Sequence, residues 1–120
     1  PEQARGGEPD ARTDIYSLGA VAYFMLTGRP PFEGPKAMDV IIAHARDPVV
    51  PPSMVRPGIP DDLEKIVLRC LAKDPTRRYA SAEELKAALA NCELANRWTE
   101  ANARRWWTET APRDDVGVPV

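Results

Sequence analysis

Residues 13–28 read Thr-Asp-Ile-Tyr-Ser-Leu-Gly-Ala-Val-Ala-Tyr-Phe-Met-Leu-Thr-Gly, and this stretch decides the fold. Apolar side chains fill almost every position after Asp14, a pattern typical of a helix that is buried on all sides. Thr or Asp at the start is a helix-capping residue, and Gly28 with the following prolines ends the pattern. We therefore expect a helix from Thr13 to about Thr27 that is the central, buried helix of a small domain.

The segments that follow also show helical patterns. Residues 36–46 place apolar side chains on one face, and a proline-rich loop follows over residues 48–60. Asp61-Asp-Leu-Glu64 and Ser81-Ala-Glu-Glu84 resemble capping boxes, so we expect helices from there to about Lys73 and about Cys92. A last helical stretch is predicted over residues 93–110. No segment alternates as strands do, so the sequence predicts an all-α fold.

Composition excludes several classes of protein. An apolar fraction of 43% supports a real core, and a net charge of -2 with interspersed signs gives no case for nucleic-acid or membrane-surface binding. No apolar run is long enough for a transmembrane helix, and no signal peptide is present, so we expect no membrane contact in this segment and a cytoplasmic location. Cys70, Cys92 and His44 have neither metal-ligand nor disulfide spacing, so no metal site is predicted.

Three short motifs stand in a fixed order along the chain: Pro1-Glu2, Asp14 to Gly19, and Leu71-Ala-Lys-Asp-Pro-Thr-Arg-Arg78. In this order they resemble the C-terminal lobe of bacterial-type serine/threonine protein kinases, from the last two letters of the A-P-E motif onward. The resemblance covers about three quarters of the chain. It implies the helical C-lobe portion of the protein-kinase fold, with a partial kinase domain over 1–92, an extra Trp-rich helix over 93–110 and a flexible tail over 111–120.

The resemblance gives several residues structural rather than catalytic roles. Glu2 would form a buried ion pair with Arg78, and Arg77 is a less suitable partner because it comes one step too early in the motif. Asp14 and Gly19 belong to the same motif, and the Asp14 carboxylate would hydrogen-bond the backbone of the catalytic loop. Asp14 could equally be the capping residue of an ordinary helix. Val21 and Met25 match positions beneath the adenine-side hydrophobic stack, where they would pack in the core.

The complete enzyme would use ATP and Mg²⁺ to phosphorylate Ser or Thr of protein substrates. The Gly-rich loop, the strand Lys, H-R-D and D-F-G are all absent from these 120 residues. We therefore assign no catalytic, cofactor-binding or metal-binding residue here, and expect this chain to be inactive alone. Its start inside the A-P-E motif, without Met, favours an incomplete polypeptide whose partners are the N-lobe and catalytic loop of the same protein.

Three alternatives stay open at this point. The chain could instead be a pseudokinase remnant or a helical scaffold and interaction module. Residues 36–46, with the proline-rich loop, match a docking region for substrates and regulators, but could also be a solvated surface. The face that carries Trp98 and Trp106, with Trp107 beside it, is expected to pack onto the lobe or onto the missing parts, with binding of a partner as the alternative.

Overall fold

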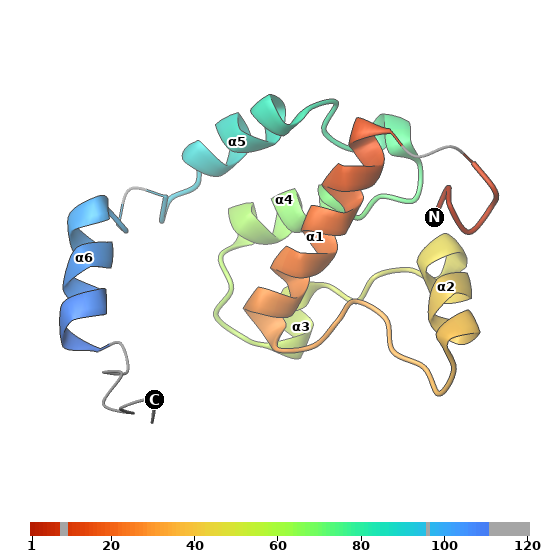
Figure 1. Cartoon of the computed structure of the whole chain (residues 1–120), viewed down its shortest axis with the longest axis horizontal. Coiled ribbons are helices and arrows are strands. Elements are labelled where there is room, and N and C mark those ends of the chain that lie inside the picture. Colours follow the sequence, from red (N-terminus) through yellow and green to blue (C-terminus); the bar gives the residue numbers. More distant parts are fainter. Residues whose placement is uncertain (8–9, 96, 111–120) are drawn as a thin grey trace, which may run out of the picture.

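The computed structural model describes residues 1–7, 10–95 and 97–110, and over these residues the chain is helical without strands (Figure 1). The all-α prediction is confirmed for this part of the chain. Of the helices described here, none has the length and apolar character needed to cross a membrane. The elements in chain order are α1 (Ala11–Thr27), α2 (Ala37–Arg46), α3 (Pro52–Val55), α4 (Asp61–Cys70), the 3-10 helix η1 (Pro75–Arg77), α5 (Ala82–Ala90) and α6 (Glu100–Glu109).

Helix α1 begins two residues earlier than predicted, because Asp10 is its N-cap. The Asp10 carboxylate accepts hydrogen bonds from the backbone N–H groups of Arg12 and Thr13, at 2.9 and 3.2 Å. The Thr13 hydroxyl in turn accepts from the Asp10 backbone N–H at 3.1 Å. The predicted end is confirmed: Gly28 adopts φ 77°, and its N–H donates to the Phe24 carbonyl at 2.7 Å.

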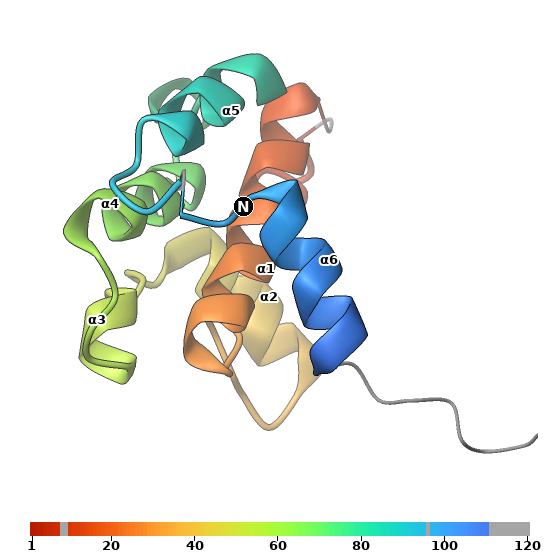
Figure 2. The same cartoon turned by 90° about the vertical axis from the view of Figure 1, so that its left-hand side faces the viewer.

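The core lies where α1 crosses α4, with α3 beneath the C-terminal end of α1 (Figure 1). Figure 2 shows α5 on the same side of α1 as α4. One buried cluster faces α5 and a second faces α3; their members are Ile15, Ile66, Cys70, Tyr79 and Leu85, and Tyr16, Tyr23, Val67 and Leu71. Gly19 lies at the crossing, where an added Cβ would stand 2.6 Å from the Cβ of Cys70. The two helices therefore approach more closely than any larger residue would allow.

The expectation that α1 is buried on all sides is wrong for this structure. Leu18, Val21 and Met25 are 50%, 54% and 75% exposed, and Phe24 is exposed as well. Only one side of α1 is covered by α3 and α4, and no described residue covers the opposite side. We refer to Leu18, Val21 and Met25 as the α1 stripe.

Two boundaries of α4 differ from prediction. The expected capping box at its start is wrong: Pro60 is the N-cap, and Glu64 instead accepts from the backbone N–H of Ser53 at 2.8 Å. The helix ends at Cys70 instead of Lys73, because the backbone that follows turns to present its carbonyl groups to Arg78.

Helix α5 follows the prediction more closely. The Ser81 hydroxyl accepts from the Glu84 backbone N–H at 3.2 Å, as expected of an N-cap. The Glu84 carboxylate accepts from Ala80, one residue before the cap, at 3.0 Å. The helix ends at Ala90, two residues before the predicted end.

The C-terminal region departs most from prediction. Helix α6 begins only after the N-cap Thr99, so the helix expected over residues 93–110 is wrong for its first part. Figure 1 shows α6 standing apart from the other helices. Trp98, Trp106 and Trp107 are all exposed, so this face does not pack onto the described part of the lobe, and packing onto the missing parts of the protein stays a prediction. The tail predicted over 111–120 lies outside the described residues.

The close crossing of α1 and α4 predicts the effect of Gly19→Ala. Alanine would gain about 1 kcal/mol of helix propensity, but its Cβ would collide with Cys70, and overpacking of this kind costs about 1–3 kcal/mol. We expect a net loss in the free energy of unfolding, measured by chemical denaturation. Ser17→Ala, at an exposed position of the same helix, is the control and should change stability by less than about 0.5 kcal/mol. A stabilised Gly19→Ala variant would contradict the close crossing.

Candidate functional site

Arg78 is a buried charge at the centre of the molecule, only 2% exposed. A guanidinium has five N–H groups, and here each of them has an acceptor. Two donate to the two carboxylate oxygens of Glu2, at 2.8 and 2.9 Å. The other three donate to backbone carbonyls, those of Ala72 at 2.7 Å, Arg12 at 3.0 Å and Lys73 at 3.3 Å. The charge is therefore completely hydrogen-bonded although it is removed from water.

Glu2 completes the pair from the other end of the chain. Its carboxylate accepts the two-pronged contact from Arg78 and a further hydrogen bond from the Thr13 hydroxyl at 2.9 Å. The hydrogen bonds from Arg78 hold the pKa of Glu2 well below its usual range, and partial burial opposes this shift without reversing it. The ring of Tyr16 lies 4.8 Å from the guanidinium carbon of Arg78, a cation–π distance.

This network joins three segments that are far apart in sequence. It ties the N-terminal turn to the start of α1 and to the loop between α4 and α5. The structure places Glu2 against Arg78, while Arg77 is exposed. A bidentate, fully hydrogen-bonded pair of this kind fixes geometry as well as adding stability. The arrangement holds the backbone of these three segments in place.

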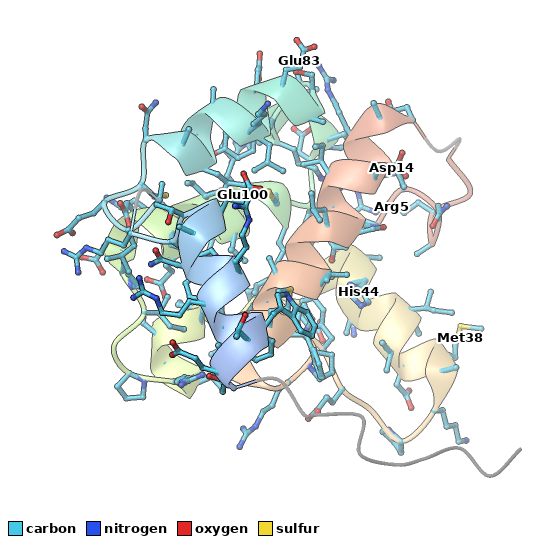
Figure 3. All side chains as sticks on the ribbon, turned by 60° about the vertical axis from the view of Figure 1, so that its left-hand side comes forward. Arg5, Asp14, Met38, His44, Glu83 and Glu100 are labelled. Carbon is cyan, nitrogen blue, oxygen red and sulfur yellow. The ribbon has the colours of Figure 1, made fainter. Side chains whose placement is uncertain are left out.

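The other predicted site residues do not meet the ion pair. Asp14 lies exposed in the first turn of α1, and its carboxylate has no hydrogen-bond partner among the described residues (Figure 3). Gly19 lies at the contact with α4. Val21 and Met25 belong to the exposed α1 stripe rather than to a packed core. The structure thus separates a closed centre around Arg78 from an open face on α1.

Sequence reasoning missed a second cluster, which holds α2. The Tyr16 hydroxyl and His44 Nδ1 are 2.7 Å apart. Lys73 donates to the carbonyls of Ala43 and His44, at 3.3 and 2.9 Å, and its ammonium lies 4.3 Å from the centre of the Phe32 ring. These residues come from four separate segments without a shared spacing, so no pattern in the sequence groups them.

The residues present do not fit a site for ATP or Mg²⁺. Over the residues that the structure describes, no three His, Cys, Asp or Glu side chains gather as metal ligands. One hollow in this part of the chain has a volume of about 480 Å³ and lies between the N-terminal turn, α1 and α2. The polar side chains among its lining residues belong to Gln3, Thr13, Tyr16, Ser17 and His44, and no Lys or Arg lines it to bind phosphate.

Comparison with family models found no match, whereas comparison with curated proteins found kinases that this chain is similar to. The serine/threonine-protein kinases PknB of Mycobacterium leprae and Mycobacterium tuberculosis are 51% and 49% identical to it over 89 residues. A probable serine/threonine-protein kinase of Streptomyces coelicolor is 44% identical over 92 residues. The matches cover 74% of this chain for the two PknB proteins and 77% for the third. The chain spans only 14% of the length of each of these relatives.

The network around Arg78 predicts a large effect of Arg78→Ala. The substitution leaves the Glu2 carboxylate and three backbone carbonyls without their donor, and breaking such a buried pair costs about 3–5 kcal/mol. We expect a loss of that size in the free energy of unfolding. Arg77→Ala is the matched control, since it removes the same charge one residue earlier at an exposed position, where changes stay within about 0.5 kcal/mol. Equal effects of the two substitutions would contradict the network.

Proposed function

We propose that this chain, which is similar to bacterial serine/threonine protein kinases over 74% of its length, forms part of the C-terminal lobe of an ATP-dependent enzyme that phosphorylates Ser or Thr of proteins. The observation that carries the proposal is the identity of about 50% to PknB over 74% of the chain. Residues 1–92 would be the lobe and residues 93–110 an addition to it. Since the enzyme needs ATP, the proposal places this lobe in the cytoplasm.

In this proposal the Glu2–Arg78 pair serves the enzyme as a scaffold. The pair fixes the segment that carries Glu2 against α1 and the loop before α5. Phosphoryl transfer depends mainly on positioning and on neutralisation of charge, so a rigid lobe beneath the active site is what the reaction requires. ATP and Mg²⁺ would be held by residues outside this chain, and the 120 residues alone would be inactive.

The α1 stripe supports a second part of the proposal, that α1 packs against the remainder of the catalytic domain. Leu18, Val21 and Met25 stand at helical spacing on one face, next to the exposed Phe24. A contiguous apolar surface of this kind marks an interaction site. Asp14 lies near the start of the same helix, where its free carboxylate could accept hydrogen bonds from the backbone of the catalytic loop.

Helix α2 is proposed as the docking surface for protein substrates or regulators. Met38, Ile41 and Ile42 are exposed on it and form an apolar row, which we call the α2 row. Figure 3 shows Met38 and His44 at different positions along this helix. Only Ala43 of α2 is buried, so most of the helix surface is available for a partner.

One observation favours a different class of function, a helical interaction module. Trp98, Trp106 and Trp107 are exposed, and the rings of Trp106 and Trp107 meet edge to face at 4.9 Å. Large aromatic side chains of this kind are typical anchors of protein interfaces. If the protein has lost kinase activity, this Trp-rich region is where a scaffold function would lie.

The kinase proposal predicts phosphoryl transfer by the natural polypeptide that carries this chain. We expect it to transfer radiolabelled phosphate from ATP with Mg²⁺ to itself or to a protein Ser or Thr. Met25→Asp should reduce this activity at least tenfold, because it puts a charge where the α1 stripe packs on the catalytic domain. Leu94→Asp, at another exposed apolar position, should leave activity within about twofold.

Two results would each contradict one part of the proposal. No phosphate transfer by the natural polypeptide would favour the pseudokinase or scaffold alternative. Full activity of Met25→Asp would show that the α1 stripe is not a packing surface, while leaving the kinase assignment in place.

A further inference from the structure

Helix α2 is attached to the rest of the molecule mainly by polar contacts at its C-terminal half. Lys73 donates to the carbonyls of Ala43 and His44, and Arg5 donates to the carbonyl of Ala45 at 2.6 Å. These cations bind the end of the helix where the dipole is negative. The side chains of the apolar α2 row stay largely exposed, so they add little to this attachment.

A hydrogen bond between the side chains of Tyr16 and His44 links α2 directly to α1. Tyr16 is buried, and burial raises its pKa to about 12, so the hydroxyl keeps its proton. His44 Nδ1, at 2.7 Å, is the only partner of this hydroxyl among the described residues. We assign the hydroxyl as the donor and Nδ1 as the acceptor, because the protonated hydroxyl has no other acceptor among the described residues. The arrangement therefore requires a neutral imidazole.

The charges around His44 are mostly positive. Lys73 contacts the backbone of His44 itself, Arg5 binds the next residue, and Arg78 lies behind the ring of Tyr16. The Pro1 amino group also acts on His44. Two carboxylates lie in this group: Glu2 is paired with Arg78, and Asp47 acts on Lys73. Burial first, and then the positive charge of Lys73, lower the pKa of His44.

We propose that the contact between Tyr16 and His44 is a latch that positions α2 on α1, and that protonation of His44 releases it. An imidazolium would direct an N–H of its own at the Tyr16 oxygen, leave the hydroxyl proton without an acceptor, and stand beside Lys73. The latch rests on the proposed function only in that α2 is the docking surface; the contact itself is independent of kinase activity. Tyr16 and His44 are thus positioning residues for the α2 row.

The direction of the pH effect follows from the lowered pKa. Because the folded protein favours neutral His44, the stabilisation is complete above the usual histidine pKa of about 6.5. It is lost as pH falls through the lower value in the folded protein. Helix α2 should therefore loosen in weakly acidic solution before the rest of the lobe does.

Hydrogen exchange with mass spectrometry on the natural polypeptide, between pH 8 and pH 5, tests the latch. After correction for intrinsic exchange, amides of α2 should lose protection by roughly threefold to tenfold on acidification, the equivalent of one hydrogen bond. Amides of α5 should not follow. Tyr16→Phe keeps the ring against Arg78 and should lower the protection of α2 at pH 8 while abolishing its pH response.

His44→Gln provides the matched variant, because its amide oxygen can still accept from Tyr16 but does not titrate. It should keep the protection of α2 at pH 8 and remove the pH response. Unchanged protection of α2 across this range, or a full pH response in Tyr16→Phe, would overturn the latch. Hydrogen exchange is measured without any substrate. A failed phosphorylation assay would therefore contradict the proposed function but would not affect the test of the latch.

Discussion

The structure depends on one buried cation whose every N–H group is hydrogen-bonded. Arg78 binds the Glu2 carboxylate with two of them and three backbone carbonyls with the others. Removing a charge from water is costly, and only complete pairing makes it tolerable. Here that pairing uses the first residues of the chain, the start of α1 and the loop after α4, so the position of one side chain fixes three segments at once.

The local structure near Arg78 follows from this requirement. Helix α4 ends at Cys70 because the carbonyls of Ala72 and Lys73 turn toward the guanidinium. The same turn places Lys73 against the end of α2, and Tyr16, whose ring stacks on Arg78, reaches His44. The attachment of α2 is therefore built onto the ion pair, so the closed centre of the lobe and its proposed docking surface share residues.

Sequence reasoning succeeded where the signal is local. Gly28 and Ser81 mark helix ends through their own backbone and side-chain chemistry, and the structure has them in those roles. It failed where the hydrogen-bond partner is distant in sequence. The Glu64 carboxylate accepts from the backbone N–H of Ser53, and the Tyr16 hydroxyl is hydrogen-bonded to His44, 28 positions away. Sequence reasoning also misjudged α1, because a run of apolar residues predicts a surface that another part of the protein covers but does not identify that part. The pairing of Glu2 with Arg78 came from the kinase resemblance, since no spacing rule joins residues so far apart.

A double-mutant cycle on Glu2 and Arg78 tests the account most directly. The free energies of unfolding of Glu2→Gln, Arg78→Ala and the double variant give the coupling between the two side chains. If the pair organises the lobe, the coupling should be about 2–3 kcal/mol, and the second substitution should cost far less than the first. A coupling of about 0.5 kcal/mol or less, as surface ion pairs show, would contradict the central role of this contact.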